Sequence, residues 1–443
     1  MSISATRRAF LPSPSLPLVY VAGAHGCLAA ALAVLVVDPA LPGTFVYHPR
    51  ALALVHLVTL GWISGSILGA LYIVSPLAFG VPLRAGRLDA WACACYWSGT
   101  AGMVGGFWSG RYDVIGVASL FVIAPLCVIG MRVVAGLRRA RLPAGVSLHV
   151  VLAFANIAGA GIAGVLLAVN RLSGSLPWSP VALAAAHAHL ALLGWAMMMI
   201  FGVAYRLIPM FVPAGMPSGP RLAVSAVLLE IGTIGLAAAL ALGLSPLPWL
   251  AFVVGALLAF FQVVRGIVRD KRPRPPDLPP RDWSTWHTHL AMAYLFVATV
   301  LGVVVATSAS SPALIWSYGA TGLLGFVVQM VVGIGGRLLP MYAWYRAVER
   351  SDGQLPAISA HRLIVPQLSL AVLLCWLAGL PLFTAGLVRG APALIAGGAG
   401  AMLIGTTMNA VHVWALTSRA ERSLAPAAEF SSAPPRREDR ARP

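Results

Sequence analysis

The stretch that decides the fold is residues 181–212, VALAAAHAHLALLGWAMMMIFGVAYRLIPMFV. Apart from its histidines, this run carries a single charged residue, Arg206, close to its C-terminal end. A helix needs about 20 apolar residues to cross the hydrocarbon core of a bilayer. Only helices and closed barrels satisfy every backbone polar group in lipid, and this run lacks the alternation of a barrel strand. It therefore predicts a membrane-spanning helix.

The rest of the chain has the same character. Its 443 residues are 59% hydrophobic and only 10% charged, with a mean hydropathy of +0.86, whereas soluble domains are about 25% charged. We therefore expect an all-α polytopic membrane protein with membrane lipids as its immediate partners. Twelve spans are predicted, at residues 17–37, 50–79, 88–108, 113–136, 145–169, 181–212, 221–243, 246–268, 284–306, 312–345, 363–387 and 391–417.

The basic residues predict the orientation of the chain. The net charge is +17, but Lys and Arg interrupt apolar runs instead of gathering on one face, which argues against nucleic-acid binding. Of the 30 basic residues, 24 fall in loops and tails on one side of the twelve spans and four in loops on the other. By the positive-inside rule both termini lie in the cytoplasm. The location expected is a bacterial-type inner membrane, with the first apolar run retained as an anchor.

Two of the predicted spans share an internal repeat. The second span contains HLVTLGW at residues 56–62 and the sixth contains HLALLGW at residues 189–195. A proline follows each histidine by 20 residues, at Pro76 and Pro209. The joint match of His, Gly, Trp and Pro at equal spacing makes a chance origin improbable.

The tenth span repeats the second half of this pattern. RLIPM at residues 206–210 becomes RLLPM at residues 337–341, and the position of the histidine is taken by Ala320. The chain is therefore predicted to consist of three pseudo-symmetric four-helix units. Their ranges, with the linker and tails, are 1–16 (cytoplasmic tail), 17–136 (unit 1), 137–270 (unit 2), 271–283 (cytoplasmic linker), 284–418 (unit 3) and 419–443 (disordered cytoplasmic tail).

The spans that precede the repeats also contain histidines. His25 and His289 each lie 31 residues before the repeat position, and His149 lies 40 residues before its own. We expect these three residues to be equivalent, with a longer loop in the second unit.

Seven histidines that lie within predicted spans, near one end of each, are candidates for a site: His25, His56, His149, His187, His189, His287 and His289. Ionisable residues inside a membrane are costly and mark functional sites, and imidazole is a common ligand for metals and haem iron. The alternative is that each histidine only hydrogen-bonds to a neighbouring helix.

The pair His187-Ala-His189 is informative because residues two apart on a helix lie about 200° around its axis. The two side chains therefore address different flanks of the helix. The leading hypothesis is an outer haem site formed by His56 with His187 or His189. A second, inner metal or haem site is predicted from His149, His287 and His289, with His25 lying deeper.

These features resemble the haem–copper oxidase subunit I superfamily, and within it the shorter NnrS-type proteins. The resemblance rests on the twelve-span layout, the threefold repeat, His56 near the outer end of the second span, the His187-Ala-His189 pair, and GRLLPM at residues 336–341. It implies that His56 is an axial ligand of a low-spin haem b or a, of which haem b is the cofactor expected here. NnrS-type relatives bind haem and copper and act in nitric oxide tolerance, so copper and a small diatomic gas are implied as well.

The chain departs from the family where oxygen is reduced. The tenth span contains no His-x-His pair and the seventh span contains no histidine. A conventional oxygen-reducing haem–copper centre is therefore not expected. Because no Cys-x-x-Cys-His motif for covalent haem is present, electrons are expected from quinol or from a separate cytochrome.

Three further residues are candidates for the site. Arg206 and Arg337 at the cytoplasmic helix ends either pair with haem propionates or extend to lipid headgroups. Glu230, a carboxylate inside a span, either relays protons or is a protonated side chain bonded to a neighbour. The sequence thus favours a haem protein for electron transfer or diatomic gas chemistry, and possible turnover would make it a haem-dependent oxidoreductase. The alternatives are a transporter or copper permease and a non-catalytic haem sensor or assembly factor.

Overall fold

Long helices make up most of the part of the chain that the structure describes. The computed structural model describes residues 10–175, 177–273, 283–308 and 311–424, and these contain no strand beyond one isolated bridge between Pro356 and Leu424. The all-α prediction is confirmed for this part of the chain. Most of the predicted linker and of the two predicted tails lies outside the described residues.

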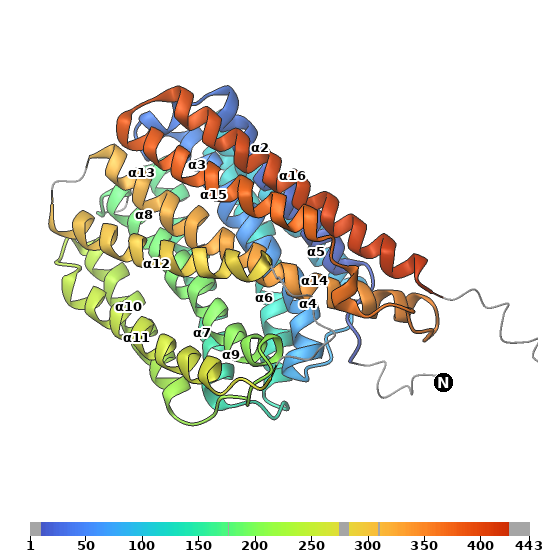
Figure 1. The fold of residues 1–443 in the computed structure, drawn as a ribbon. Helices are drawn as coiled ribbons and strands as arrows, with labels where there is room; N and C mark the ends of the chain where they lie inside the picture. The colour runs from blue at the N-terminus through green and yellow to red at the C-terminus, as the bar shows by residue number, and fades with distance from the viewer. Residues whose placement is uncertain (1–9, 176, 274–282, 309–310, 425–443) are drawn as a thin grey trace, which may run out of the picture.

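Twelve continuous helical rods can be followed through the described residues (Figure 1). Nine are single helices: α2 (Leu16–Val37), α5 (Arg87–Ser109), α6 (Tyr112–Leu137), α7 (Ala144–Ser173), α10 (Arg221–Leu242), α11 (Leu247–Arg269), α12 (Trp283–Thr307), α15 (Pro366–Arg389) and α16 (Pro392–Arg422). Three rods are composite, because each consists of several helical segments that follow one another without a break. The first consists of α3 (Pro49–His56), η2 (Leu57–Ser64), α4 (Gly65–Val74) and η3 (Ser75–Phe79), and the second of α8 (Pro180–His189), η4 (Leu190–Met197) and α9 (Met198–Phe211). The third consists of α13 (Pro312–Ala320), η5 (Thr321–Val328) and α14 (Gln329–Arg350).

Within the described residues, eleven rods are long and apolar enough to cross a membrane, and α5 is the rod outside this set. The multi-pass membrane character is therefore confirmed, while the count of twelve spans stays a prediction. The composite rods are the core of the bundle, because 72%, 72% and 61% of their apolar windows are buried, against 17–56% for the other eight.

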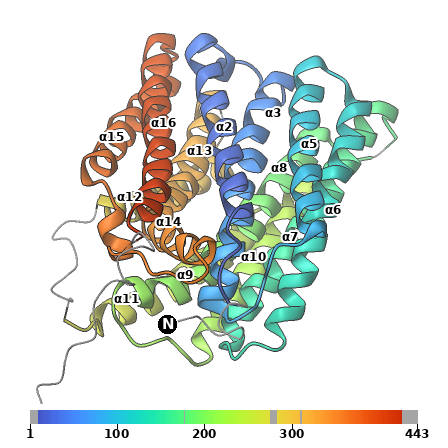
Figure 2. The same ribbon diagram turned by 90° about the vertical axis from the view of Figure 1, so that its right-hand side faces the viewer.

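The outer helices form hairpins around this core. The pairs α5–α6, α10–α11 and α15–α16 pack against each other, and the α15–α16 pair lies side by side in both views (Figures 1 and 2). Each pair turns at a glycine in the left-handed region, with φ of +70° at Gly110, +66° at Gly243 and +59° at Gly390. Only glycine adopts this conformation without strain, which is why it ends so many helices.

The three composite rods share one unusual feature. Eight residues immediately after His56, His189 and Ala320 form a π-helix, in η2, η4 and η5. A π-helix has wider turns than an α-helix and is frequent at functional sites. Each π-helical segment begins directly after the repeat position that holds His56, His189 or Ala320. The three rods therefore share a backbone distortion as well as a sequence pattern.

A glycine at the fifth position of each π-helical segment lets a neighbouring helix approach closely. These glycines are Gly61, Gly194 and Gly325. A Cβ added there would lie 2.3, 2.6 and 2.6 Å from side-chain atoms of Cys27, Asn156 and Tyr294. Small residues that allow such contacts are typical of helix packing in membranes. Each composite rod therefore packs directly against the helix that precedes it.

The contacts of α2 and α7 correct the expected equivalence of the histidines. On α2, Tyr20 and Cys27 face the glycines at positions 69 and 61; on α7, His149 and Asn156 face those at positions 202 and 194. His149 thus corresponds to Tyr20, and its predicted equivalence to His25 is wrong. Loops of different length separate these helices from the composite rods, so distance along the sequence does not preserve the register.

The residue of α7 that corresponds to His25 is Phe154. The His25 ring meets Trp62 edge-on, with ring centroids 4.8 Å apart, and the Phe154 ring lies 5.3 Å from Trp195. Trp62 and Trp195 occupy the same repeat position, six residues after their histidines. The first two repeats therefore pair an aromatic or imidazole ring with a tryptophan at the same place.

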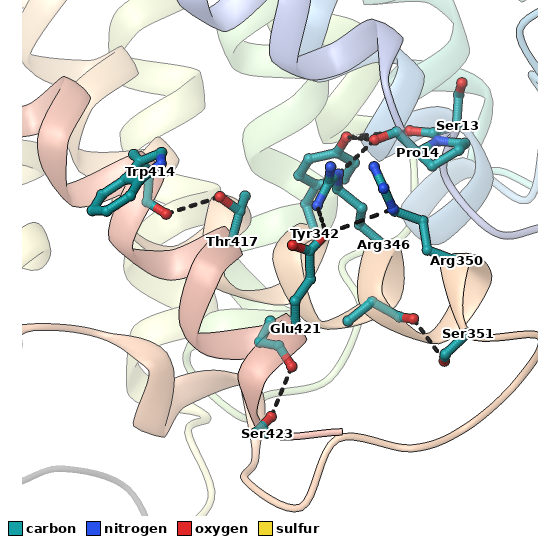
Figure 3. Close-up of polar contacts among 12 residues, drawn as sticks. Ser13, Pro14, Tyr342, Arg346, Arg350, Ser351, Trp414, Thr417, Glu421 and Ser423 are labelled. Atoms are coloured by element: carbon teal, nitrogen blue, oxygen red, sulfur yellow. Dashed lines mark hydrogen bonds and ion pairs between the residues drawn. The ribbon is translucent and has the colours of Figure 1, made fainter. Parts of the chain in front are cut away.

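The two ends of the described chain meet at one end of the bundle (Figure 3). Pro14, before α2, accepts hydrogen bonds on its carbonyl from Tyr342 and Arg346 of α14, at 2.9 and 2.8 Å. Arg346 and Arg350 also form ion pairs with Glu421 near the end of α16, at 2.5 and 3.6 Å. Residues near the two ends of the described chain therefore lie on the same side of the bundle.

Candidate haem site

His56 and His187 lie together between the first two composite rods. Their ring centroids are 6.4 Å apart and their ring planes differ by 23°. The Phe107 ring of α5 stacks on His56 at 4.8 Å. Both histidines are half-buried, although they lie within predicted spans. The structure thus brings together two of the residues predicted for the outer haem site.

Backbone carbonyls hold one nitrogen of each ring. His56 donates from Nδ1 to Leu52 O at 2.7 Å, and His187 donates from Nδ1 to Ala160 O of α7 at 2.8 Å. These bonds place the proton on Nδ1 and leave the Nε2 lone pair as an acceptor, an arrangement frequent in histidines that bind metals. No described residue hydrogen-bonds to Nε2 of His56 or His187.

The separation of the two rings fits a single iron between them. An imidazole nitrogen lies about 2 Å from the metal it binds. Two rings that coordinate one ion from opposite sides therefore have centroids about 6 Å apart, close to the 6.4 Å found here. The spacing would let the two imidazoles hold one metal ion between them.

His189 faces the other flank of its helix, as the spacing of the His-x-His pair predicts. It donates from Nδ1 to Ala185 O at 2.8 Å, and its Nε2 lies 3.1 Å from the hydroxyl of Tyr318. The hydroxyl can donate to this nitrogen, so His189 already has partners on both nitrogens. Of the two options left open by the sequence, the contacts favour His187 as the partner of His56.

The two contacts are related by the repeat. His56 meets His187, which is two residues before the repeat histidine of the second rod, and His189 meets Tyr318, two residues before Ala320. Two imidazoles therefore meet between the first and second composite rods, and an imidazole meets a phenol at the equivalent place between the second and third rods. Tyr318 and Phe107 are site residues that the sequence analysis did not identify. The position of Tyr318 could have been found by extending the repeat two residues upstream of Ala320.

The structure does not bring the predicted inner histidines together. His149 donates to Gly145 O and lies 3.2 Å from the Ser225 hydroxyl, which in turn lies 2.8 Å from that of Tyr205. His287 bonds to the Gln329 amide oxygen. These polar contacts belong to separate pairs of helices.

His289 and His25 lie in other surroundings again. The His289 ring lies edge-on to Trp286, with centroids 5.7 Å apart, and His25 bonds to Asn409 at 3.1 Å. Across the described residues, no group of three or more His, Cys, Asp and Glu side chains is arranged to hold a metal ion. A metal centre built from His25, His149, His287 and His289 thus has no support in this geometry.

Arg206 and Arg337 bind the ends of neighbouring rods. Arg206 donates to Ala78 O at 3.0 Å, and Arg337 donates to Phe211 O and to the Thr285 hydroxyl, both at 3.1 Å. Arg206 is 17 residues beyond His189, or roughly 25 Å at 1.5 Å per residue. The two arginines therefore lie at the opposite end of the rods from the His56–His187 pair, and they join the composite rods to one another.

Glu230 is half-buried on α10 and accepts a hydrogen bond from the Asn156 amide of α7 at 2.7 Å. Asn156 lies one helical turn before Ala160, whose carbonyl holds His187. No described hydrogen bond connects Glu230 to a histidine. Its place is next to the helix that orients the site, and a proton relay through it stays a prediction.

No protein-family model matches the chain, and no curated protein matches it significantly. The resemblance to haem–copper oxidases therefore stays a hypothesis, and the site has to be interpreted from its own geometry.

Proposed function

We propose that this protein is a membrane electron-transfer protein that binds one haem b between His56 and His187. The observation that carries the proposal is the pair of facing imidazoles, 6.4 Å apart, each with Nδ1 held by a backbone carbonyl. When bound, haem supplies one-electron redox chemistry. The haem–copper oxidase resemblance supports the same cofactor.

The surrounding residues have defined roles in this proposal. Leu52 O and Ala160 O fix the orientation and tautomer of the two rings, and Phe107 covers one side of His56. The ligands come from different composite rods, so the site stabilises the contact between them. The π-helical segments that follow His56 and His189 set the rotation at which the rods meet.

We further propose that all twelve rods cross a bacterial-type inner membrane, in three four-helix units with both termini in the cytoplasm. The even number of rods, the meeting of the chain ends beside α14 and the distribution of basic residues support this arrangement. Quinol or a separate cytochrome is the proposed electron donor.

Gas chemistry requires a further condition. If His56 and His187 both held a haem iron, they would leave nitric oxide no free position unless one of them were displaced. Reaction with nitric oxide, a role for copper and a non-catalytic sensor role therefore remain weaker proposals than electron transfer, because no observed contact favours them.

A carbon monoxide titration tests electron transfer against gas binding. The purified protein is loaded with haem b and reduced with dithionite, and its optical spectrum is recorded before and after carbon monoxide is added. We expect sharp reduced bands that carbon monoxide leaves unchanged, because both axial positions are filled. A shift of the Soret band would contradict two-histidine coordination and favour gas chemistry.

A further inference from the structure

Five exposed basic residues lie at the end of the α10–α11 hairpin that is opposite its turn. They are Arg221 at the start of α10 and, in the last turns of α11 or just beyond it, Arg265, Arg269, Lys271 and Arg272. The two helices are antiparallel, and Gly232 of α10 packs against Val253 of α11. Counted outward from this contact, Arg221 lies level with Val264, next to Arg265. We call these five residues the basic patch.

Carboxylates do not balance the basic patch. Asp270 is its acidic neighbour in the sequence, and within the described residues none of the five basic side chains forms an ion pair. Other arginines at this end of the bundle do have acidic partners, in the pairs Arg84–Glu349, Arg132–Asp89 and Arg346–Glu421. The basic patch therefore carries a positive charge that the described chain does not neutralise.

The length of α11 places the basic patch at the depth of lipid headgroups. This helix has 23 residues and is apolar enough to cross a membrane. At 1.5 Å per residue it is roughly 35 Å long, slightly more than the hydrocarbon core, which is about 30 Å thick. Arg269, its last residue, therefore reaches the level at which the hydrocarbon ends and the lipid phosphates begin.

One face of α11 continues from apolar residues into the basic patch. Leu258, Phe261, Arg265 and Arg269 follow one another at intervals of three or four residues, so they lie on the same face of the helix. All four side chains are exposed. A phospholipid has the same order of groups, with acyl chains below a charged phosphate.

We propose that the basic patch binds the headgroup of an anionic phospholipid, whose acyl chains lie along the exposed face of α11. Arginine matches the geometry of a phosphate group, and basic side chains at a membrane surface attract anionic lipids. A soluble acidic protein would also be attracted by the charge, but it would not cover Leu258 and Phe261 on the same face. This second site does not depend on haem binding at His56 and His187.

A matched pair of lipids tests the requirement for an anionic headgroup. Phosphatidylglycerol or phosphatidylcholine with identical acyl chains is added to the purified full-length protein in detergent, and bound lipid is counted by native mass spectrometry. We expect phosphatidylglycerol to bind at least about ten-fold more tightly, because each basic residue near a membrane surface contributes about five-fold. Glycerophosphoglycerol, the same headgroup without acyl chains, should not compete at the concentration of the lipid.

Two double variants locate the site. Arg265→Gln combined with Arg269→Gln removes two charges from the basic patch and should weaken phosphatidylglycerol binding at least about ten-fold. The control combines Arg171→Gln with Arg389→Gln, which removes the same charge from the exposed ends of α7 and α15 at the other end of the bundle. It should bind phosphatidylglycerol as the wild type does.

Three results would overturn the proposal: equal retention of the two lipids, competition by the free headgroup, or equal affinity of the two double variants for phosphatidylglycerol. Equal retention of the lipids would leave the basic patch to a soluble acidic partner. The measurement is repeated with His56→Ala. Binding of phosphatidylglycerol that persists in this variant shows that the lipid site and the proposed haem site stand or fall separately.

Discussion

Replacing either His56 or His187 with alanine is expected to abolish the low-spin haem spectrum. Each substitution removes one of two axial ligands, and the loss of a metal ligand costs more than the 10–100-fold in affinity typical of its supporting residues. Haem per chain, measured as the pyridine haemochrome of protein purified from identical cultures, should fall more than about ten-fold. The fold should be retained, because both side chains are half-buried and each donates only one hydrogen bond.

The matched controls are His189→Ala and His361→Ala. His189 lies on the opposite flank of the same helix and bonds to Tyr318, and His361 lies in the short helix η6 (Ala360–Leu363), which packs against α14 and α16. Both variants should keep the wild-type spectrum. If His189→Ala lost haem while His187→Ala kept it, the second ligand would be His189, and its assignment to His187 would be wrong.

Asp89→Ala should be the most destabilising single substitution of a charged residue. The carboxylate is 2% exposed and accepts hydrogen bonds from the Tyr72 hydroxyl at 2.6 Å and from Gly86 N at 2.7 Å, and it forms an ion pair with Arg132. Removing the carboxylate leaves the buried Tyr72 hydroxyl without its acceptor and the partly exposed Arg132 without its counter-charge. We expect a loss of about 3 kcal/mol in the free energy of unfolding, measured by thermal and denaturant unfolding in detergent.

The comparison is Asp113→Ala, which removes the acidic partner of an exposed ion pair. Arg111 and Asp113 have side chains that are 63% and 57% exposed, and exposed pairs contribute about 0–1 kcal/mol. A similar loss of stability in the two variants would show that the Asp89 cluster does not join α5, α6 and the first composite rod as the contacts indicate.

Much of the fold could be predicted from the sequence because membrane solvation imposes it. Length and apolarity of the runs locate the helices, and the repeat of His, Gly, Trp and Pro marks the long rods. The separation of His187 and His189 onto two flanks followed from helix geometry alone. The π-helical segments could not be predicted, because they depend on how closely Gly61 and Gly194 approach the neighbouring helices.

The site residues were predicted less completely. Sequence distance suggested that His25, His149 and His289 are equivalent, but the packing of α2 and α7 sets a different register. Arg206 and Arg337 were placed at helix ends, yet they bond to carbonyls of adjacent rods. Some contacts join residues that are distant in the chain: His25 and Asn409, for example, are 384 residues apart. No local sequence pattern encodes such contacts.

Low-temperature electron paramagnetic resonance of the oxidised, haem-loaded protein tests the central claim most directly. Two neutral imidazoles on one ferric iron give a low-spin signal that integrates to one spin per chain, and we expect this signal in the wild type. A high-spin signal, or a protein that retains no iron when haem is supplied in excess, would contradict the assignment of His56 and His187 as its two ligands.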